Sequence, residues 1–488
     1  MDLDRTPLGI AGAGTMGAGI AAAARDAGLR VMLHDPYPAA RERADGIEWA
    51  AELADLAPCG FVIEAAPEDL GVKRALFAAL AGVVAPDAVL ATNTSSLLVS
   101  EIAAGVPDPE RVVGLHFFNP VAKMRLVELV AGAQSSPAAL ARARAVAESL
   151  GKQVIAAADG PGFIVNRCNR PFTLEALRIV QERLATPEQV DRVCRLACGF
   201  RMGPFELMDL VGIDVGYAVA RSFHEQSHGE PRWRPSPLAA RMAASGRLGR
   251  KSGHGWYDYP PGRPPDPPAP DPGGGDGLVV VAGASETAAW LLESALEAGW
   301  EAAAPWEAEG AVPFLIIDCG GGEDDVPLQG GPQLLLCEGA PLAAQDPGGA
   351  SAGFFVPTPV LDGGLVELTR TPATAPATTA AVERFFATLG RRPEWVGDGP
   401  GLVSGRMLAQ LVNEACFALG EGAGSAADID MGMELGLNHP RGPLAWGDEI
   451  GPEAVLDTLL ALWEEFREER YRPAPALVRA ARSETPLR

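Results

Sequence analysis

The chain has 488 residues, of which 47% are hydrophobic and 21% are charged, and its formal net charge is −23. This length predicts two to four domains with cores of their own, and the composition is that of a folded, soluble protein. The acidic balance argues against nucleic acids and anionic membranes as partners.

Seven cysteines are scattered along the chain without the spacing of a metal site. Cys194 and Cys198 lie one helical turn apart, but no second pair of ligands follows them. This pattern predicts no metal and indicates reduced cysteines in a cytoplasmic protein. The chain begins without a basic segment followed by an apolar one, and no apolar run reaches about 18 residues, so we expect neither export nor a membrane span.

The first predicted elements form a β-α-β unit. Residues 8–14, LGIAGAG, have the pattern of a buried strand that enters a glycine turn. Residues 15–28 predict a helix and residues 29–34 a second strand, an order that implies a parallel sheet. FVIEAA at 61–66 and AVLATNTSS at 88–96 continue this series of strands that end in loops. We therefore expect an α/β domain in the N-terminal part.

The turn after the first strand has the glycine spacing of a dinucleotide-binding loop, GAGTMG at 12–17. The first glycine permits a tight turn, the second lets a pyrophosphate approach the backbone, and the third lets helix and strand pack closely. Asp35 ends the next strand, where a carboxylate binds the adenine ribose diol and repels a 2′-phosphate. The second signature of a flavin protein is absent, and a glycine turn without a ligand is the other alternative. The prediction is NAD, held by Gly12, Gly14, Thr15, Met16, Gly17 and Asp35.

A histidine and a glutamate occur in two strand-like runs joined by a proline-broken loop, in GLHFFNPVAKMRLVELV at 114–130. A connection of this length allows the strands to lie side by side and His116 to meet Glu128. A buried carboxylate raises the basicity of an imidazole and fixes its tautomer, as a general base requires. We predict that His116 takes the proton of a substrate hydroxyl while hydride passes to NAD, without a metal. A core histidine and a strand-edge charge are the alternatives.

The rest of the first half predicts helices, and a linker follows. Residues 166–200 and 205–225 have helical periodicity without strand signals. The Pro and Gly content of PPGRPPDPPAPDPGGGD at 260–276 predicts a linker. Beyond it, three segments of the first half recur in the same order; DGPGFIVNR at 159–167, for example, recurs as DGPGLVSGR at 398–406. These repeats indicate an internal duplication.

The second copy is predicted to lack the chemistry of the first. In the sequence comparison Gly353 takes the place of His116, and Gly405 takes the place of Asn166. The segment VVVAGASETAAW at 279–290 contains a strand pattern but lacks the full glycine triplet. We therefore expect a structural role for the second half.

Seven segments together resemble the L-3-hydroxyacyl-CoA dehydrogenase family, especially its longer bacterial members with a duplicated C-terminal domain. In family order they are GAGTMGAGIA, PEDLGVKRALF, ATNTSSL, GLHFFNPVAKMRLVELV, GPGFIVNR, MGPFELMDLVGID and GRLGRKSGHGWYDY. The resemblance covers 8–258 and, more faintly, 353–450. It implies an α/β plus all-α fold with these parts: a Rossmann-type NAD-binding domain at 1–158, a helical 6-phosphogluconate-dehydrogenase-like domain at 159–259, a Pro/Gly linker at 260–277, a degenerate Rossmann-like segment at 278–397 and a second helical domain at 398–488.

The resemblance also assigns roles to residues of the matching motifs. His116 corresponds to the catalytic base of the family, and Glu128 corresponds to the partner of that base. Ser95 matches a serine that hydrogen-bonds the substrate oxygen, and Asn166 matches an asparagine that holds the substrate across the domain boundary. Taken alone, Ser95 has the alternative role of a helix cap. Further cofactor contacts are implied for Glu68, Lys73, Asn93, Ser95, Asn119 and Lys251, the last of which reaches the cofactor when the domains close or else is a surface charge.

One departure from the family concerns residues 36–60. Family members carry a charged helical arm there, which contributes basic residues to the CoA nucleotide. In this sequence only PYPAARERADGIEWAAELADLAPCG separates the two strands, so the arm is missing or reduced to one short helix. Arg41 and Arg43 are expected on a solvated helix face.

The activity that the resemblance implies is the NAD-dependent oxidation of a short-chain (S)-3-hydroxyacyl-CoA, such as 3-hydroxybutyryl-CoA, to the 3-oxoacyl-CoA, as in fatty acid β-oxidation. Because the arm is short, a free 3-hydroxy acid is an alternative substrate. An NAD-binding protein without catalysis is the third hypothesis. In single-copy relatives a second subunit covers the helical domain, and the duplicate can do so within one chain, so both a monomer and a homodimer are expected forms.

Overall fold

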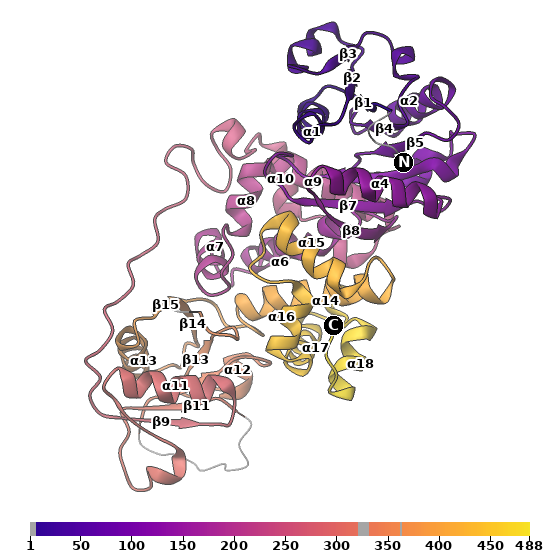
Figure 1. Cartoon of the computed structure of the whole chain (residues 1–488). Helices are drawn as coiled ribbons and strands as arrows, with labels where there is room; N and C mark the ends of the chain where they lie inside the picture. Colours follow the sequence, from indigo (N-terminus) through magenta and orange to yellow (C-terminus); the bar gives the residue numbers. More distant parts are fainter. Residues whose placement is uncertain (1–5, 321–330, 362–363) are drawn as a thin grey trace.

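The computed structural model describes residues 6–320, 331–361 and 364–488. These residues form two β-sheets at opposite ends of the molecule, with most of the helices between them (Figure 1). Within the three described ranges, no helix combines the length and the apolar character needed to cross a membrane.

The first sheet has eight strands in the order β3-β2-β1-β4-β5-β6-β7-β8. Neighbouring strands are parallel except for β6 and β7, which are antiparallel. The central strands are buried along their whole length, as expected for a sheet covered on both faces. The strands are β1 (Leu8–Ala11), β2 (Val31–His34), β3 (Glu48–Ala50), β4 (Phe61–Glu64), β5 (Val89–Thr92), β6 (Val112–Phe117), β7 (Leu126–Ala131) and β8 (Gln153–Ala158).

Four helices of the N-terminal part cover this sheet. Helices α1 (Thr15–Asp26) and α4 (Pro137–Ser149) pack on one face, in a cluster that includes Ile20 and Val146. Helices α2 (Leu70–Val83) and α3 (Val99–Ala103) pack on the other face. This is the Rossmann-type arrangement expected from the sequence, and it brings the loops after β1, β4, β5 and β6 to one edge of the sheet.

Residues 36–60 contain no α-helix. They form the 3-10 helices η1 (Pro38–Arg43) and η2 (Leu53–Leu56), with the edge strand β3 between them. The sequence did not predict β3, because three residues that change from exposed to buried without alternation carry little pattern. Arg43 is exposed, as expected, but its Nη1 donates a hydrogen bond to the backbone oxygen of Ala13 at 3.1 Å, so it lies against the glycine loop.

The first helical unit follows β8. Its apolar side chains form a second core together with residues from the C-terminal half of the chain. Its helices are α5 (Val165–Cys168), α6 (Arg170–Gln181), α7 (Pro187–Leu196), α8 (Pro204–Val211), α9 (Ile213–Gln226) and α10 (Pro237–Ala244), with the 3-10 helices η4 (Pro231–Trp233) and η5 (Arg250–Ser252).

Residues 264–276 contain neither helix nor strand and run along one side of the molecule (Figure 1). The segment is attached to its neighbours: Arg195 Nη2 donates to Asp266 Oδ1 at 2.7 Å, and the Gly273 N–H donates to Thr388 O at 2.7 Å. The predicted linker is therefore extended and packed against the protein.

The second sheet repeats the first with one strand fewer. Its order is β10-β9-β11-β12-β13-β14-β15, with β13 and β14 antiparallel and no counterpart of β3 among the described residues. The strands are β9 (Leu278–Ala282), β10 (Glu301–Ala303), β11 (Leu315–Asp318), β12 (Gln333–Leu336), β13 (Ala352–Phe355), β14 (Leu365–Arg370) and β15 (Arg392–Trp395); the helices are α11 (Glu286–Glu297), α12 (Leu342–Gln345) and α13 (Pro376–Thr388), with the 3-10 helix η6 (Pro305–Glu307).

The strand register corrects one sequence comparison. Glu367 of β14 lies opposite Phe355 of β13, whereas Gly353 lies opposite Thr369. The counterpart of His116 is therefore Phe355 and not Gly353. The sequence comparison was displaced by two residues because it matched two Phe-Phe pairs, and a shift of two keeps every side chain on the same face of the sheet.

The prediction for Gly405 is confirmed by backbone contacts. Glu367 accepts hydrogen bonds from the N–H groups of Val403 and Ser404, as Glu128 in the first half accepts from those of Ile164 and Val165. Gly405 follows Ser404 just as Asn166 follows Val165.

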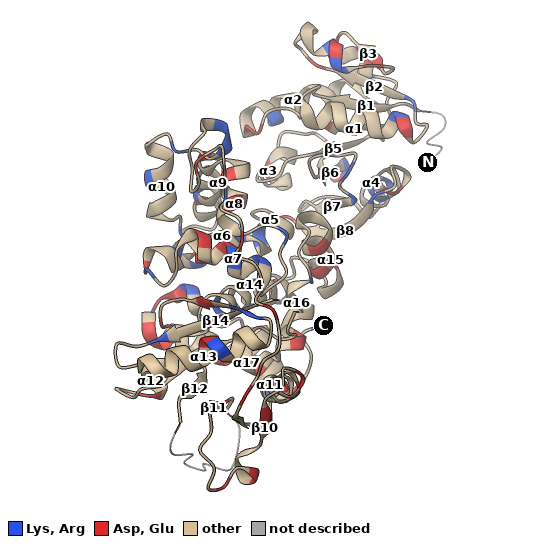
Figure 2. Cartoon of the chain, turned by 90° about the vertical axis from the view of Figure 1, so that its left-hand side faces the viewer, with Lys and Arg blue, Asp and Glu red and all other residues tan. Residues whose placement is uncertain are grey.

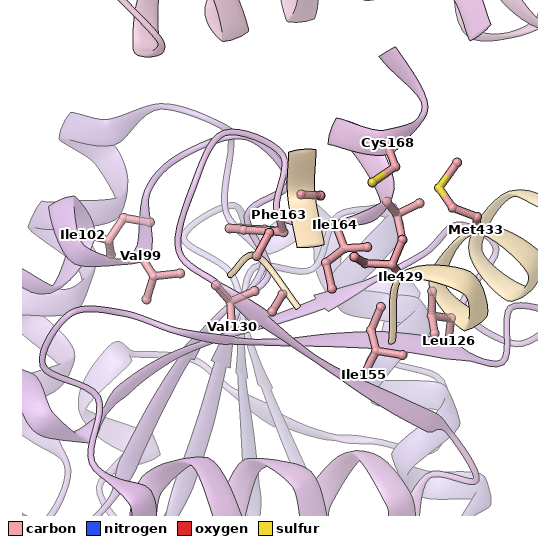
Figure 3. Packing of buried hydrophobic residues seen from close by; sticks show 14 of the residues in the cluster. Val99, Ile102, Leu126, Val130, Ile155, Phe163, Ile164, Cys168, Ile429 and Met433 are labelled. Atoms are coloured by element: carbon pink, nitrogen blue, oxygen red, sulfur yellow. The ribbon is translucent and has the colours of Figure 1, made fainter. Parts of the chain in front are cut away.

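The second helical unit packs on the first sheet. Ile429 and Met433 of α15 lie beside Leu126, Ile155 and Ile164 of the first half (Figure 3). The helices of this unit are α14 (Ser404–Gly420), α15 (Ala426–Leu437), α16 (Pro443–Ile450), α17 (Pro452–Phe466) and α18 (Pro475–Ser483), with the 3-10 helix η7 (Glu469–Tyr471).

The two halves contact each other reciprocally. The N–H of Ala158, at the end of β8, donates to Ala423 O at 2.8 Å, and the N–H of Gly397, just after β15, donates to Leu184 O at 2.6 Å. Each sheet is thus joined to the helical unit of the other half, as in a symmetric dimer made within one chain.

Ion pairs of two buried arginines repeat this symmetry where α6 and α14 meet, in the middle of the molecule (Figure 2). Arg167 of the first half pairs with Glu414 at 2.9 Å and Glu421 at 2.6 Å. Its counterpart Arg406 forms a buried ion pair with Glu175 and pairs with Glu182 at 2.7 Å.

Candidate active site

The histidine and the glutamate of the 114–130 segment face each other on neighbouring strands. His116 of β6 is directly opposite Glu128 of β7, and its Nδ1 lies 2.7 Å from Oε2 of the carboxylate. The Glu128 side chain is fully buried, and that of His116 is 8% exposed. Because a carboxylate only accepts hydrogen bonds, Nδ1 is the donor to Glu128, and in the neutral imidazole this tautomer leaves the lone pair on Nε2.

The backbone holds this carboxylate in place. Oε1 of Glu128 accepts hydrogen bonds from the N–H groups of Ile164 and Val165, each at 3.0 Å, at the start of α5. The imidazole is also confined, because the rings of Phe118 and Phe163 lie 4.5 and 6.0 Å from it, centroid to centroid. The positions of the His116 and Glu128 side chains are therefore fixed before any substrate binds.

Asn166 and Ser95 join the helical unit to the first sheet beside this pair. Asn166 follows the two residues that bind Glu128, and its Nδ2 donates to the backbone oxygen of Ser95 at 3.3 Å. Gln226, near the end of α9, adds a second link, since its Nε2 donates to Ser96 O at 2.8 Å. The predicted catalytic residues His116, Glu128, Ser95 and Asn166 thus come from two strands, a strand-end loop and a helix and lie at one edge of the sheet.

Glu68 organises the loop after β5. Its Oε1 accepts hydrogen bonds from the Thr94 hydroxyl at 2.7 Å and from the N–H groups of Ser95 and Ser96 at 2.9 and 3.0 Å. Burial alone would raise the pKa of the Glu68 carboxyl, but the Lys73 ammonium and these hydrogen bonds outweigh it and hold the pKa below its usual range. Glu68 is therefore an anion that fixes the position of Ser95.

Lys73 lies behind Glu68. Its side chain is 1% exposed, and its ammonium donates to Oε1 of Glu64 at 2.7 Å and to Ala66 O at 3.3 Å. The distance to Oε2 of Glu68 is 3.4 Å. In this arrangement Lys73 binds the two carboxylates and does not itself project from the protein surface.

The glycine loop has the shape that a dinucleotide requires. Gly12 has φ +113°, a left-handed conformation, and a Cβ there would lie 2.6 Å from Ala65 O. A Cβ on Gly17 would lie 1.8 Å from Gly12 O, so helix α1 packs on β1 only with glycine at this position. A Cβ on Gly14 would meet nothing within 4 Å, which leaves open space in front of the helix N-terminus for a phosphate.

Helix α1 begins with Thr15 and Met16, directly after this open space. Asp35 follows β2, and its Oδ2 accepts a hydrogen bond from the Ala13 N–H at 2.8 Å, which places the carboxylate beside the loop. These residues fit NAD: the loop and helix N-terminus can hold its pyrophosphate, and Asp35 can hold its adenine ribose.

The remaining predicted cofactor residues differ in position. Asn93 Oδ1 accepts from the Phe117 N–H at 2.8 Å and so joins the ends of β5 and β6. Asn119 is exposed in the loop between β6 and β7. Lys251 lies elsewhere, on the helical unit, where its Nζ is 2.6 Å from Oδ1 of Asp214.

Two further residues of the site were not singled out from the sequence. Glu64 is the last residue of β4, and an acid at the end of a fully buried strand is a signal that could have identified it. Gln226 gave no such signal, because its contact with the loop after β5 spans 130 residues of sequence.

A Rossmann-type sheet with a dinucleotide loop and a histidine–carboxylate pair at its strand ends defines an NAD-dependent dehydrogenase. The family model for the NAD-binding domain of 3-hydroxyacyl-CoA dehydrogenase matches residues 7–47 and 38–160. The model for the C-terminal domain matches twice, at 162–259 and 401–486, which confirms the duplication. The chain belongs to the 3-hydroxyacyl-CoA dehydrogenase family.

Relatives of two lengths resemble this chain. It is 35% identical over 499 residues to 3-hydroxyadipyl-CoA dehydrogenase of Escherichia coli, covering 96% of both chains. It is 41% identical over 280 residues to 3-hydroxybutyryl-CoA dehydrogenase of Mycobacterium tuberculosis, covering 52% of this chain and 98% of the relative. The crystal structure of 3-hydroxybutyryl-CoA dehydrogenase from Escherichia coli K12 superimposes with a TM-score of 0.83 at 32% identity, over 98% of this chain and 99% of the other.

Proposed function

We propose that this enzyme oxidises (S)-3-hydroxyacyl-CoA to 3-oxoacyl-CoA with NAD, reversibly, and that His116 is its general base. The observation that carries the proposal is the His116–Glu128 pair, 2.7 Å long and buried, at the same edge of the sheet as the glycine loop. Bound NAD would accept the hydride from C3 of the substrate.

The protein's part in this reaction is to move and hold a proton. Nε2 of His116 takes the proton of the C3 hydroxyl as the hydride leaves. The imidazolium that forms is stabilised by Glu128, whose other oxygen is already held by two backbone N–H groups. We assign Ser95 and Asn166 to the substrate oxygen and thioester, because they lie beside this pair and are linked to each other.

We further propose that the glycine loop and Asp35 hold NAD, with Asn93 and Asn119 near the strand ends that face the cofactor. Glu68 and Lys73 are proposed to act by positioning the loop that carries Ser95, as their hydrogen bonds suggest. Lys251 is proposed to reach the cofactor only if the helical unit closes on the sheet, which would require it to leave Asp214.

We propose the boundaries 1–158, 159–259, 260–277, 278–397 and 398–488 for the parts of the chain, and a monomer as its active form. The reciprocal ion pairs of Arg167 and Arg406 support the monomer, since they already join two equivalent helical units within one chain. A cytoplasmic location agrees with the seven buried, free cysteines. Sedimentation at micromolar concentration distinguishes the monomer from a homodimer.

The proposal is tested by NADH consumption with acetoacetyl-CoA beside the same assay with free acetoacetate. Oxidation of NADH with the thioester alone is expected, and it would show that residues 36–60 need no long arm for CoA. Activity with the free acid alone would contradict the thioester as substrate. Binding of NADH without turnover of any thioester would contradict catalysis.

A further inference from the structure

The turn formed by Ser95 and Ser96 lies between the first sheet and the first helical unit. On the side of the sheet, Oε1 of Glu68 accepts hydrogen bonds from the N–H groups of the two serines at 2.9 and 3.0 Å. The Ser96 hydroxyl donates to the same oxygen at 2.9 Å. These bonds satisfy the backbone donors of the turn and leave its two backbone oxygens for other partners.

The helical unit supplies those partners from two of its helices. Nδ2 of Asn166 in α5 donates to Ser95 O at 3.3 Å. Nε2 of Gln226, the last residue of α9, donates to Ser96 O at 2.8 Å. The turn that carries the serine proposed for the substrate oxygen is therefore held from both sides, and the bond of Gln226 is the shorter of the two from the helical unit.

Gln226 is itself oriented by its own helix. Its Nε2 also donates to Oγ of Ser222, four residues earlier on α9, at 2.8 Å. A carboxamide nitrogen has two hydrogens, so Ser96 O and Ser222 use both of them. Oε1 of Gln226 is buried and has no hydrogen-bond partner among the described residues. Because an unpaired buried acceptor is unfavourable for folding, Gln226 is a poor choice for stability alone.

We propose that Gln226 is a positioning residue, which acts through Ser96 O to hold Ser95 where it meets the substrate oxygen beside His116. Gln226 does not touch the reacting atoms, and it links the substrate serine to the helical unit. This inference rests on the proposed function and adds a residue to the same site.

The physical reason is the rigidity of the peptide units around Ser95. Ser96 O belongs to the planar unit between Ser96 and Leu97, which follows directly after the unit that starts at Ser95. Without Gln226, the printed bonds of this unit come from within the same loop, where the Leu97 N–H donates to the Thr94 hydroxyl at 3.0 Å. A misplacement of about 1 Å in a group that orients the substrate can lower the rate about 100-fold, so a bond from the helical unit is valuable here.

The test uses two substitutions of Gln226 in the full chain, with NADH and acetoacetyl-CoA as substrates. Gln226→Met keeps the length of the side chain but donates no hydrogen bond. It is expected to lower kcat/KM about 2- to 12-fold, the value of a neutral hydrogen bond, with little change in NADH affinity measured by fluorescence titration. Gln226→Glu is expected to lose more at neutral pH, because its carboxylate then faces the carbonyl oxygen of Ser96.

The pH dependence of Gln226→Glu gives the sharper readout. As the pH falls from about 8 to about 5.5, a carboxyl beside a carbonyl oxygen takes up a proton and can again donate to Ser96 O. The ratio of variant to wild-type kcat/KM should therefore rise towards one as the pH falls. Since both proteins contain His116, the ratio removes the pH dependence of the base itself.

Gln181→Glu is the matched control, because Gln181 is the exposed last residue of α6, as Gln226 is the last residue of α9. Its ratio to the wild type is expected to be close to one at every pH. A ratio for Gln226→Glu that does not change with pH would overturn the inference. It would also be overturned if Gln226→Met lowered the melting temperature but left kcat/KM unchanged, since that result shows a structural role only.

The wild type separates this inference from the proposed function. A wild type that reduces acetoacetyl-CoA while both Gln226 variants match it would overturn the role of Gln226 and leave the proposed function standing. A wild type that binds NADH but reduces no thioester would overturn the proposed function and, with it, the role of Gln226.

Discussion

The two sheets have equivalent glutamates, one on each, with different neighbours on the facing strand. Glu128 faces the imidazole of His116, whereas Glu367 faces the ring of Phe355. Both accept hydrogen bonds from two backbone N–H groups at the start of the first helix of a helical unit, α5 for Glu128 and α14 for Glu367. The shared contact is therefore structural, because it binds the first turn of the helix, and the imidazole is what adds chemistry to it.

The residue after those N–H groups changed together with the histidine. A Cβ on Gly405 would lie 3.1 Å from the ring of Phe355, so a larger residue would not fit without a shift. The first half has His116 and Asn166 at these two positions, and the second half has Phe355 and Gly405. The Phe355 ring fills this space in the second half, so a phenyl ring and not an imidazole faces Glu367.

The loops after β1 and β9, the first strand of each half, also differ. After β9, Gly283 repeats the turn of Gly12 with φ +110°, but Ser285 caps α11 where Gly14 leaves open space. Glu286 then stands in the first turn, where its charge repels a pyrophosphate. The second half has the strand order of a Rossmann-type sheet, but its first loop lacks the open space and the uncharged first turn found at Gly14 and Thr15.

The largest difference between the halves is expected from substitutions at the two ring positions. His116→Ala should lower kcat by about 10²- to 10⁴-fold with little change in NADH affinity, since it removes a general base. Phe355→Ala should leave kcat nearly unchanged, although a cavity in the second half should lower thermal stability. Stopped-flow turnover measures kcat of each variant, and NADH titration measures its affinity for NADH. A normal kcat in His116→Ala would remove this residue from the mechanism.

The two central arginines test whether the halves depend on each other. Arg406→Met leaves the buried Glu175 without its cation, and breaking such a pair costs about 3–5 kcal/mol. We expect a lower melting temperature with normal activity in the protein that remains folded. Arg167→Met should destabilise to a similar extent and also lower activity, because Arg167 adjoins Asn166. Equal activities in both variants would show that the interface does not influence the site.

Substitutions of the equivalent carboxylates, Glu128 and Glu367, are expected to have a smaller effect on kcat. Glu128→Gln should lower kcat less than His116→Ala does and shift the pH profile of kcat, because the imidazolium loses its partner. Glu367→Gln should leave kcat and its pH profile unchanged. An unchanged profile in Glu128→Gln would contradict the proposed pairing.

Glu367 should instead affect stability as a function of pH. Burial raises the pKa of its carboxyl from 4.5 to about 7, with no cation opposite it. The folded state thus binds a proton that the unfolded state has already lost, so the free energy of unfolding falls as the pH rises from about 4.5 through about 7. Melting temperatures measured at about pH 5 and about pH 8 should therefore differ more in the wild type than in Glu367→Gln. Identical pH dependence in the two proteins would exclude this contribution of Glu367.

The local features of this protein can be predicted from its amino-acid sequence. The glycine spacing at 12–17 and the acid at Asp35 predict a dinucleotide loop because they belong to one β-α-β unit. The strand pattern around His116 and Glu128 predicts their contact because only a short loop joins the two strands. The order of the repeated segments predicts the duplication, since it needs no knowledge of how the copies pack.

The features that join distant parts of the chain depend on its three-dimensional packing. The register that places Phe355 opposite Glu367 depends on pairing across β13 and β14, and a two-residue shift leaves the alternation of side chains the same. The ion pairs of Arg167 and Arg406 join residues more than 200 positions apart, and a charged residue in a sequence does not indicate its partner.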